Sequence, residues 1–260
     1  MLRHERSNPN HFGRILMRIP RFYFPETLAL GARVHLPQDA AQHAIRVLRL
    51  AEGAGVALFN GDGQVYHAKI LRIEKQDVTV LIEQCAATCR ESPLQITLVQ
   101  GISSGERMDF TLQKSVELGV RAIQAIQAER SVVKLTPERK EKRLRHWQNI
   151  VNAACAQCGR NVVPSVQPAL SLTDWLAGQT PDGSLRLLLA PDAEMRLRDL
   201  EQPTGPVVLA VGPEGGFSDN ELRALQQYGF ISLRLGPRVL RTETAALAAL
   251  SALQSCWGDF

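Results

Sequence analysis

The chain has 260 residues, of which 45% are hydrophobic and 22% charged, and its formal net charge is +4. These proportions are those of an ordinary globular protein, and no apolar run approaches the roughly 18 residues that a membrane-spanning helix requires. Because the first residues also lack the apolar centre of a signal peptide, the sequence argues against a membrane protein and predicts a cytoplasmic one.

The N-terminal part divides into a tail and a small β-rich unit. Residues 1–16 are polar and without periodicity. Short β-branched runs separated by turn residues then follow, at residues 21–24, 56–60, 65–73 and 78–83. A short helix is predicted at residues 39–50. Runs of this kind predict a small antiparallel sheet or barrel over residues 17–88.

The first 49 residues are markedly basic. Eight arginines stand against Glu5, Glu26 and Asp39, which gives +5 and leaves the rest of the chain at −1. Arginines suit phosphate contacts, because each neutralised phosphate of a nucleic acid releases counterions. A solvated basic surface explains the same composition equally well, so the charge alone leaves both readings open.

A polar segment at residues 86–93, ending in Pro93, is predicted to link this unit to a second one. Beyond it strands and helices alternate. The predicted strands are residues 94–102, 122–128, 185–190, 207–211 and 231–235. The predicted helices are residues 106–118, 137–158, a helix from the capping box at Ser218 to Gly229, and 242–255. This alternation predicts an α/β domain with a mostly parallel sheet covered on both faces.

Two loops in the second unit have compositions that suit ligand binding. Residues 208–218 run from a buried strand through a glycine-rich turn into a capped helix, and they contain neither a P-loop nor a G-x-G-x-x-G pattern. A tight structural turn would have the same composition. Residues 235–245 again join a strand to a helix, and this loop carries Arg238, Arg241 and Glu243. Loops at neighbouring strand ends would form one crevice, where α/β sheets bind ligands.

The cysteines do not predict a metal site. Cys155 and Cys158 form a C-x-x-C, but Cys85 and Cys89 have the wrong spacing for a second zinc pair. The odd number, with Cys256 as the fifth, favours free thiols.

With these two loops the sequence resembles the SPOUT class of methyltransferases, and within it the family that methylates N3 of uridine 1498 in 16S ribosomal RNA. The matching pieces are GPEGGFSDNE, LGPRVLRTETA, DFTLQKSVELGV, the run at residues 154–160, and the early H-x3-VLRL at residues 43–50. The resemblance extends from about Met17 to the C-terminus. Residues 1–16 have no counterpart, so they are expected to be disordered or to precede a true start at Met17.

The resemblance implies a PUA-like RNA-binding barrel at residues 17–88 and a SPOUT methyltransferase domain with a C-terminal trefoil knot at residues 89–260. It implies a homodimer, S-adenosylmethionine as cofactor, no metal, and 16S ribosomal RNA in the small ribosomal subunit as partner. The implied cofactor-binding residues are Leu188, Leu189, Ala190, Gly212, Pro213, Glu214, Gly215, Gly216, Leu235, Gly236, Arg238, Val239, Leu240, Arg241, Thr242 and Glu243.

The implied reaction requires that N3 of uracil lose its proton, because the protonated nitrogen is a poor nucleophile. A base can take the proton, or cationic donors can stabilise the resulting anion. The catalytic candidates are Arg160 with Gln157, Lys114 with Glu117, and Glu243. Lys114 and Glu117 also fit a surface ion pair, and Glu243 also fits the general preference for carboxylates at helix N-termini.

Candidate RNA-binding residues are Arg18, Arg21, Arg46, Arg49 and Arg130. The stretch at residues 134–146 holds six Lys or Arg against two Glu, and it fits either a solvated helix face or an RNA contact. Two rival functions stay open: a methyltransferase of the same class that acts on transfer RNA, and an RNA-binding dimer without activity. Tight binding of S-adenosylmethionine would argue against the second rival, because a pure RNA-binding protein should bind none.

Overall fold

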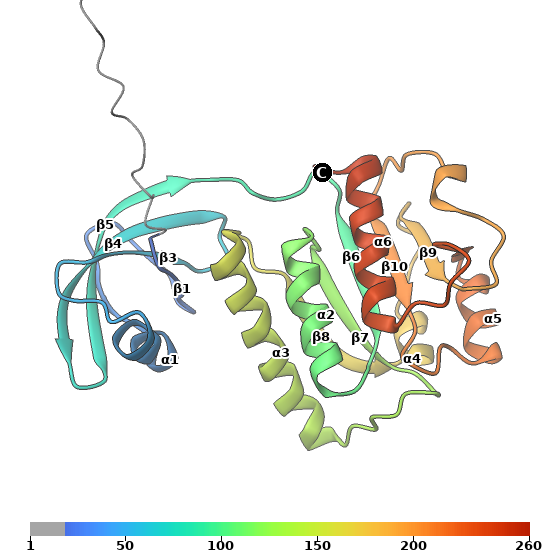
Figure 1. The fold of residues 1–260 in the computed structure, drawn as a ribbon, viewed down its shortest axis with the longest axis horizontal. Helices are drawn as coiled ribbons and strands as arrows, with labels where there is room; N and C mark the ends of the chain where they lie inside the picture. The colour runs from blue at the N-terminus through green and yellow to red at the C-terminus, as the bar shows by residue number, and fades with distance from the viewer. Residues whose placement is uncertain (1–18) are drawn as a thin grey trace, which may run out of the picture.

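The computed structural model describes residues 19–260, which pack around separate cores in an N-terminal and a C-terminal domain (Figure 1). The predicted extension at residues 1–16 and Arg18 lie outside the described residues. The elements of the N-terminal domain are β1 (Arg21–Tyr23), β2 (Arg33–His35), α1 (Gln38–Gln42), the π-helical turn η1 (His43–Val47), β3 (Gly55–Phe59), β4 (Gln64–Glu74) and β5 (Asp77–Ala87).

The N-terminal sheet has the strand order β1-β3-β4-β5-β2. Its pairs are antiparallel except β1 with β3, which are parallel, so the prediction of a wholly antiparallel sheet was wrong for this pair. The parallel pairing follows from the chain path, because β2 and the helical segment intervene between β1 and β3 and bring the chain back in the same direction. The single predicted helix at residues 39–50 is instead a short α-helix that widens into a π turn, with Leu48 N–H bonded to the carbonyl of His43.

The C-terminal domain contains a six-stranded sheet in the order β11-β9-β10-β6-β7-β8, and every pair in it is parallel. The prediction of a parallel α/β sheet is confirmed. Its strands are β6 (Ile96–Gly101), β7 (Ala122–Gln127), β8 (Ser165–Ser171), β9 (Leu185–Leu189), β10 (Val207–Val211) and β11 (Ile231–Leu233). Its helices are α2 (Gly105–Glu117), α3 (Pro137–Cys158), α4 (Leu172–Ala177), the 3-10 turn η2 (Leu197–Asp199), α5 (Asp219–Gln227) and α6 (Thr242–Trp257).

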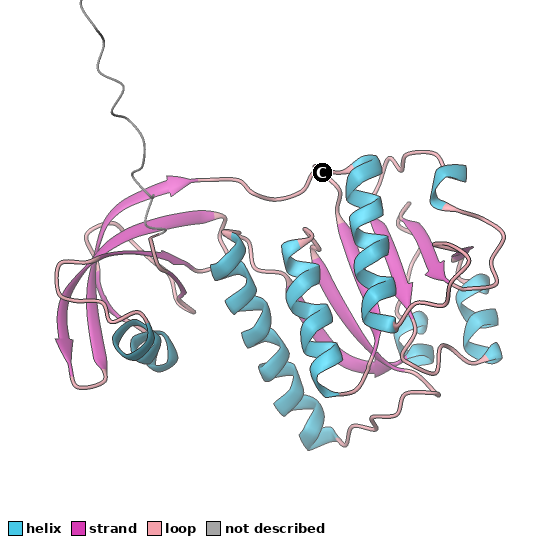
Figure 2. Cartoon of the chain, in the orientation of Figure 1, coloured by secondary structure: helices cyan, strands magenta, loops and turns pink. Residues whose placement is uncertain are grey.

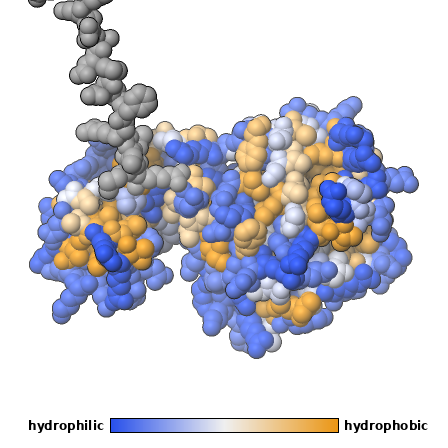
Figure 3. Space-filling model, in the orientation of Figure 1, coloured by the Kyte–Doolittle hydropathy of each residue, from blue (hydrophilic) through white to orange (hydrophobic). Residues whose placement is uncertain are grey.

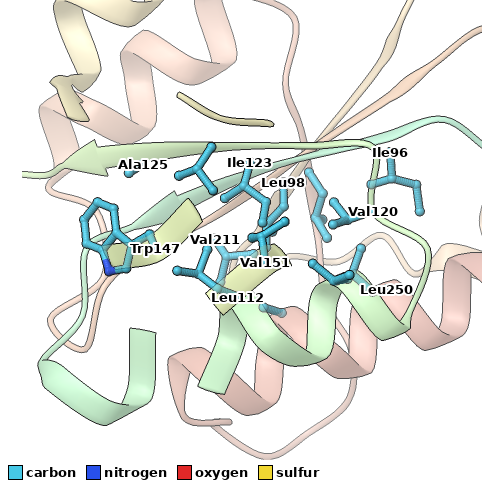
Figure 4. Packing of buried hydrophobic residues seen from close by; sticks show 14 of the residues in the cluster. Ile96, Leu98, Leu112, Val120, Ile123, Ala125, Trp147, Val151, Val211 and Leu250 are labelled. Carbon is cyan, nitrogen blue, oxygen red and sulfur yellow. The ribbon is translucent and has the colours of Figure 1, made fainter. Parts of the chain in front are cut away.

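Helices cover both faces of this sheet (Figures 1 and 2). On one face, α2, α3 and α6 pack side chains such as Leu112, Val151 and Leu250 against Leu98 and Ile123 of the central strands (Figure 4). On the other face, α4 and α5 pack against the alternate residues of the same strands in a second cluster. Burial of each large apolar side chain contributes about 1.5–3 kcal/mol, so the two layers hold the strand ends in fixed positions.

Arg160, which follows α3, connects the linker to the C-terminal end of α2, because its side chain bonds to both. Its side chain is buried, and Nη1 donates to the carbonyls of Val116 (3.0 Å) and Val120 (2.8 Å). Nε and Nη2 donate to Oε2 of Glu91 in the linker, at 3.0 and 2.5 Å. The guanidinium is therefore committed to contacts inside the C-terminal domain.

Residues 160–161 also form hydrogen bonds with the N-terminal domain. Arg21 of β1 donates from Nη2 to the carbonyl of Arg160 (3.0 Å) and to Oδ1 of Asn161 (2.7 Å). Asn161 in turn donates to the carbonyl of Thr88 (3.0 Å). Phe59 of β3, whose ring centroid lies 5.0 Å from the guanidinium of Arg21, is buried in the core of the C-terminal domain. The two domains are thus joined by specific contacts and not by the linker alone.

After the edge strand β11, the chain runs back to the centre of the sheet and forms α6 there. After β11, α6 packs against α2, and Oγ1 of Thr242 at its first turn donates to the carbonyl of Gly212 after β10 (2.5 Å). Nε2 of Gln100 in β6 donates to the same hydroxyl (3.0 Å). The loops after β10 and β11 therefore touch each other, while the trefoil knot itself stays a prediction. Within residues 19–260, no helix has both the length and the apolar character that crossing a bilayer demands.

Candidate functional site

A cavity of about 870 Å³ opens at the C-terminal ends of β9, β10 and β11. The two loops that were predicted to form one crevice follow β10 and β11; β9 lies between these strands and forms a third wall, to which the predicted residues Leu189 and Ala190 belong. All the predicted cofactor residues except Leu188 and Glu243 line this cavity. The lining residues from that set are Leu189, Ala190, Gly212, Pro213, Glu214, Gly215, Gly216, Leu235, Gly236, Arg238, Val239, Leu240, Arg241 and Thr242.

Glycines form the wall after β10 because neighbouring backbone leaves no room for a side chain. A Cβ on Gly212 would lie 3.0 Å from Cα of Gly216. A Cβ on Gly215 would lie 2.9 Å from Cβ and 3.0 Å from the carbonyl oxygen of Arg130. A Cβ on Gly101, at the end of β6, would lie only 2.4 Å from the backbone nitrogen of Pro213. The loop is therefore packed tightly between β6 and the segment after β7, and its backbone faces the cavity.

Glu214 fixes this loop to the start of α2. Its Oε1 accepts hydrogen bonds from the backbone N–H and the hydroxyl of Ser104, both at 2.9 Å, and from Nη1 of Arg107 at 3.3 Å. Burial raises the pKa of the Glu214 carboxyl, but the hydrogen bonds from Ser104 and the charge of Arg107 outweigh it. Its pKa therefore lies below the ordinary value of 4.5, and the group is a carboxylate at neutral pH.

Glu214 is expected to make the acid stability of the protein depend on pH. A carboxyl with a lowered folded pKa stabilises the folded state above its unfolded pKa, and this contribution is lost as the pH falls through the folded pKa. The melting temperature of the wild type should therefore fall more steeply below pH 4.5 than that of Glu214→Gln. Thermal unfolding from about pH 3 to pH 7 measures the difference. Equal slopes would mean that the contacts with Ser104 and Arg107 do not favour the charged carboxylate.

Arg107 joins two carboxylates at the cavity wall. It lines the cavity, it donates to Glu214, and its Nε lies 4.0 Å from Oε1 of Glu243. Glu243 does not itself line the cavity, and its side chain is 14% exposed. Among the described residues, Oε2 of Glu243 and Oε2 of Glu214 are buried and have no hydrogen-bond partner. The carboxylates of Glu214 and Glu243 thus both lie beside the guanidinium of Arg107, and one oxygen of each accepts no hydrogen bond from the described residues.

Arg107 was not among the predicted site residues, because its partners Glu214 and Glu243 are distant in the chain. The residues after β9 were also missed: Pro191, Asp192 and Ala193 all line the cavity. The available signal was their place directly after a predicted buried strand, where α/β sheets bind ligands.

Arg130, a predicted RNA-binding residue, lies at the opposite side of the glycine-rich loop. It lines the cavity, and its Nη1 donates to the carbonyl of Phe217 (3.2 Å) while Nη2 lies 3.7 Å from Oδ1 of Asp219. Beside it, Oε1 of Glu221 accepts from the backbone N–H of Glu129 (3.0 Å), and Glu221 also completes the capping box with Ser218. The start of α5 is therefore tied to the loop after β7.

The other catalytic candidates lie away from the cavity of their own chain. Lys114 and Glu117 form an ion pair of 2.8 Å, with side chains about one-third exposed, near the C-terminal end of α2. Gln157 is exposed at the end of α3. The guanidinium of Arg160 is committed to Glu91 and the carbonyls of Val116 and Val120, as described above. None of these four residues lines the cavity.

The remaining cationic candidates belong to the N-terminal domain. Arg46, in η1, and Arg49 are exposed, and Arg49 has a positive φ of 51°. Arg21 is part-buried at the junction of the two domains. All five cysteines are free, as expected. Within residues 19–260, no three His, Cys, Asp or Glu side chains are grouped so that they could hold a metal ion.

Two family models match the chain. One, described as an RNA methyltransferase domain, matches residues 90–254, and the other, described as an RNA methyltransferase PUA domain, matches residues 36–83. A curated relative from Buchnera aphidicola subsp. Schizaphis graminum is named ribosomal RNA small subunit methyltransferase E. It is 36% identical over 246 residues, which make up 93% of this chain and 98% of the relative.

Two solved structures are also similar over nearly the whole chain. A Legionella pneumophila protein, solved in complex with S-adenosylmethionine, has a TM-score of 0.89 and 44% identity, and the match covers 94% of this chain and 100% of that one. A ribosomal RNA small subunit methyltransferase E from Neisseria gonorrhoeae, solved with S-adenosylmethionine bound, has a TM-score of 0.86 and 45% identity, with the same coverage.

Proposed function

The chain belongs to the ribosomal RNA small subunit methyltransferase E family and is an S-adenosylmethionine-dependent ribosomal RNA methyltransferase; we propose that it methylates N3 of a specific uridine of 16S ribosomal RNA. The observation that carries the proposal is the glycine-walled cavity at the ends of β9, β10 and β11. In relatives of this chain S-adenosylmethionine is the bound cofactor.

The residues present fit that cofactor. A cavity of about 870 Å³ lies within the roughly 300–1,000 Å³ that ligand sites occupy. Residues 212–216 and most of residues 235–242 line two walls, and the glycines among them let a ligand approach the peptide groups closely. We propose the lining residues of these loops, with Leu189 and Ala190, as the cofactor contacts. Leu188 is fully buried and supports the cavity from within the core.

S-adenosylmethionine supplies an already activated methyl group, so the work of the protein is to prepare the uracil. We propose Glu243 as the base, because it is the catalytic candidate next to the cavity wall: it does not line the cavity, but its Oε1 lies 4.0 Å from Nε of Arg107, which does. Arg107, on the cavity wall and 4.0 Å from Glu243, can donate to the uracil oxygen on which negative charge develops.

Further parts of the proposal concern assembly. We propose a homodimer in which Lys114, Glu117 and Gln157, which lie away from the cavity of their own chain, approach the cavity of the partner subunit. Arg160 is buried and bonded to Glu91, Val116 and Val120, so its role is to hold the fold. The knotted SPOUT domain would occupy residues 89–260, and residues 17–88 would form the RNA-binding domain with Arg18, Arg21, Arg46 and Arg49. The assembled small ribosomal subunit in the cytoplasm would be the substrate.

The test is a methyl-transfer assay with labelled S-adenosylmethionine. Small subunits that lack the modification are compared with free 16S RNA and with bulk transfer RNA, and the labelled nucleoside is identified by mass spectrometry. We expect N3-methyluridine in the small subunit, at a higher rate than in free 16S RNA. Label in transfer RNA would move the substrate to another RNA, and label in another position of the base would overturn the N3 assignment. Absence of both label and cofactor binding would leave an RNA-binding dimer.

A further inference from the structure

The first half of α3 and the residue Lys134 before it form a strongly cationic surface. They carry six cations against Glu138 and Glu141. The cations are Lys134, Arg139, Lys140, Lys142, Arg143 and Arg145. Four of them are exposed, and among the described residues only Arg145 has an ion-pair partner, Glu141, at 2.9 Å. Most of this positive charge therefore has no ion-pair partner within residues 19–260.

The chain topology places this charge beside the cavity. Strands β6 and β7 are parallel, so α2 and α3, which follow them, both begin at the C-terminal edge of the sheet, where the cavity opens. A hydrogen bond of 2.8 Å between His146 and Asp109 joins α3 to the first half of α2, the helix that carries Arg107 of the cavity wall. Arg143 and Gly105 also line one small void. Figures 1 and 3 show the start of α3 at the lower, hydrophilic edge of the domain.

The cations in the first two turns of α3 do not stabilise the helix. The N-terminal end of a helix carries a partial positive charge, so carboxylates stabilise it and cations weaken it. The first turns of α5 follow that preference, with Asp219 and Glu221. In α3, Glu138 follows this preference, but Arg139 and Lys140 also occupy the first turn, and Lys142 and Arg143 the second. A charge pattern that opposes helix stability points to a role outside the helix.

We propose that the α3 basic surface, defined by Lys134, Arg139, Lys142 and Arg145, binds the phosphodiester backbone of the RNA strand next to the methylated base. Arg130 and Arg107 place further positive charge on the cavity wall. Lys and Arg are the side chains that bind phosphates, and each neutralised phosphate releases counterions. The inference rests on the proposed function, because it places the flanking strand of that same substrate.

The test uses the full-length protein with Lys142→Glu, Arg139→Glu and the double variant. RNA affinity is measured by fluorescence anisotropy with a labelled 16S RNA fragment over a salt series, and KM and kcat are measured with small subunits. Each substitution should weaken RNA binding and make the slope of log affinity against log salt shallower by about 0.7 per lost phosphate contact. S-adenosylmethionine affinity should not change. The melting temperature should hold or rise, because glutamate suits the start of a helix.

Arg121→Glu is the matched control. Arg121 is exposed directly before β7, at the opposite edge of the sheet, and the substitution changes the net charge by the same amount as Lys142→Glu. An unchanged salt slope and RNA affinity for this control, beside a loss for the α3 variants, supports the inference. Equal effects at both positions overturn it, even while the wild type methylates normally. If the wild type fails to methylate the small subunit, the proposed function fails, and the anisotropy data still decide whether α3 binds RNA.

Discussion

Replacing Gly101 with alanine is expected to weaken S-adenosylmethionine binding by about 10- to 100-fold. The new Cβ would lie 2.4 Å from the backbone nitrogen and Cδ of Pro213 and 2.8 Å from the carbonyl carbon of Gly212. Backbone cannot rotate away as a flexible side chain can, so the cavity wall itself must move. Overpacking of this kind costs about 1–3 kcal/mol, and every 1.4 kcal/mol is about tenfold in affinity.

Isothermal titration calorimetry gives the dissociation constant of S-adenosylmethionine, and thermal unfolding shows how far the substitution lowers the melting temperature of the protein. Gly178→Ala is the control, because a Cβ there meets nothing nearer than 3.6 Å and the residue has a negative φ of −85°. The control should bind the cofactor as the wild type does. Wild-type affinity in Gly101→Ala would mean that the wall after β10 does not determine cofactor binding.

Replacing Arg160 with alanine should lower the free energy of unfolding by about 3 kcal/mol. Removal of one partner from a buried ion pair costs about 3–5 kcal/mol, and the lower end applies because the Glu91 side chain is 24% exposed. The substitution also removes the Arg160 donor from the carbonyl of Val120 and one of two donors from the carbonyl of Val116, which still accepts from the N–H of Gly119. Urea denaturation measures the loss.

Lys114→Ala provides the comparison, because the Lys114–Glu117 pair lies at the surface with side chains about one-third exposed and should contribute only about 0–1 kcal/mol. Cofactor affinity of Arg160→Ala, measured at a temperature where the variant is folded, separates stability from function. A variant as stable as the wild type but without activity would contradict the structural role of Arg160 and favour its role in catalysis.

Elements with strong local signals were predictable from the sequence. The long helix α3 has Pro137 at its first turn and Gly159, with a positive φ of 91°, past its end, and its bounds were predicted correctly. α5 begins at the capping box of Ser218 and Glu221 as expected. β8 was not predicted, because its sequence is partly polar and contains Pro168. A proline is tolerated in a strand only at the edge of a sheet, which is where β8 lies.

The site was predictable only in part. Glycines and cations after a buried strand are local signals, and they identified the loops after β10 and β11. The contact of Arg107 with Glu214 joins residues 107 positions apart, and no periodicity or spacing reports such a pair. Arg160 looked available to a ligand because it follows a helix end, yet its partners come from the linker and α2. Tertiary contacts of this kind decide whether a cation serves the fold or the substrate.

The walls of the cavity come from segments far apart in the order of synthesis. The stretch after β9 is made first, the glycine-rich loop after β10 follows, and residues 235–242 are made last. No growing chain can therefore hold the cofactor until that final wall has emerged from the ribosome and α6 has begun to dock.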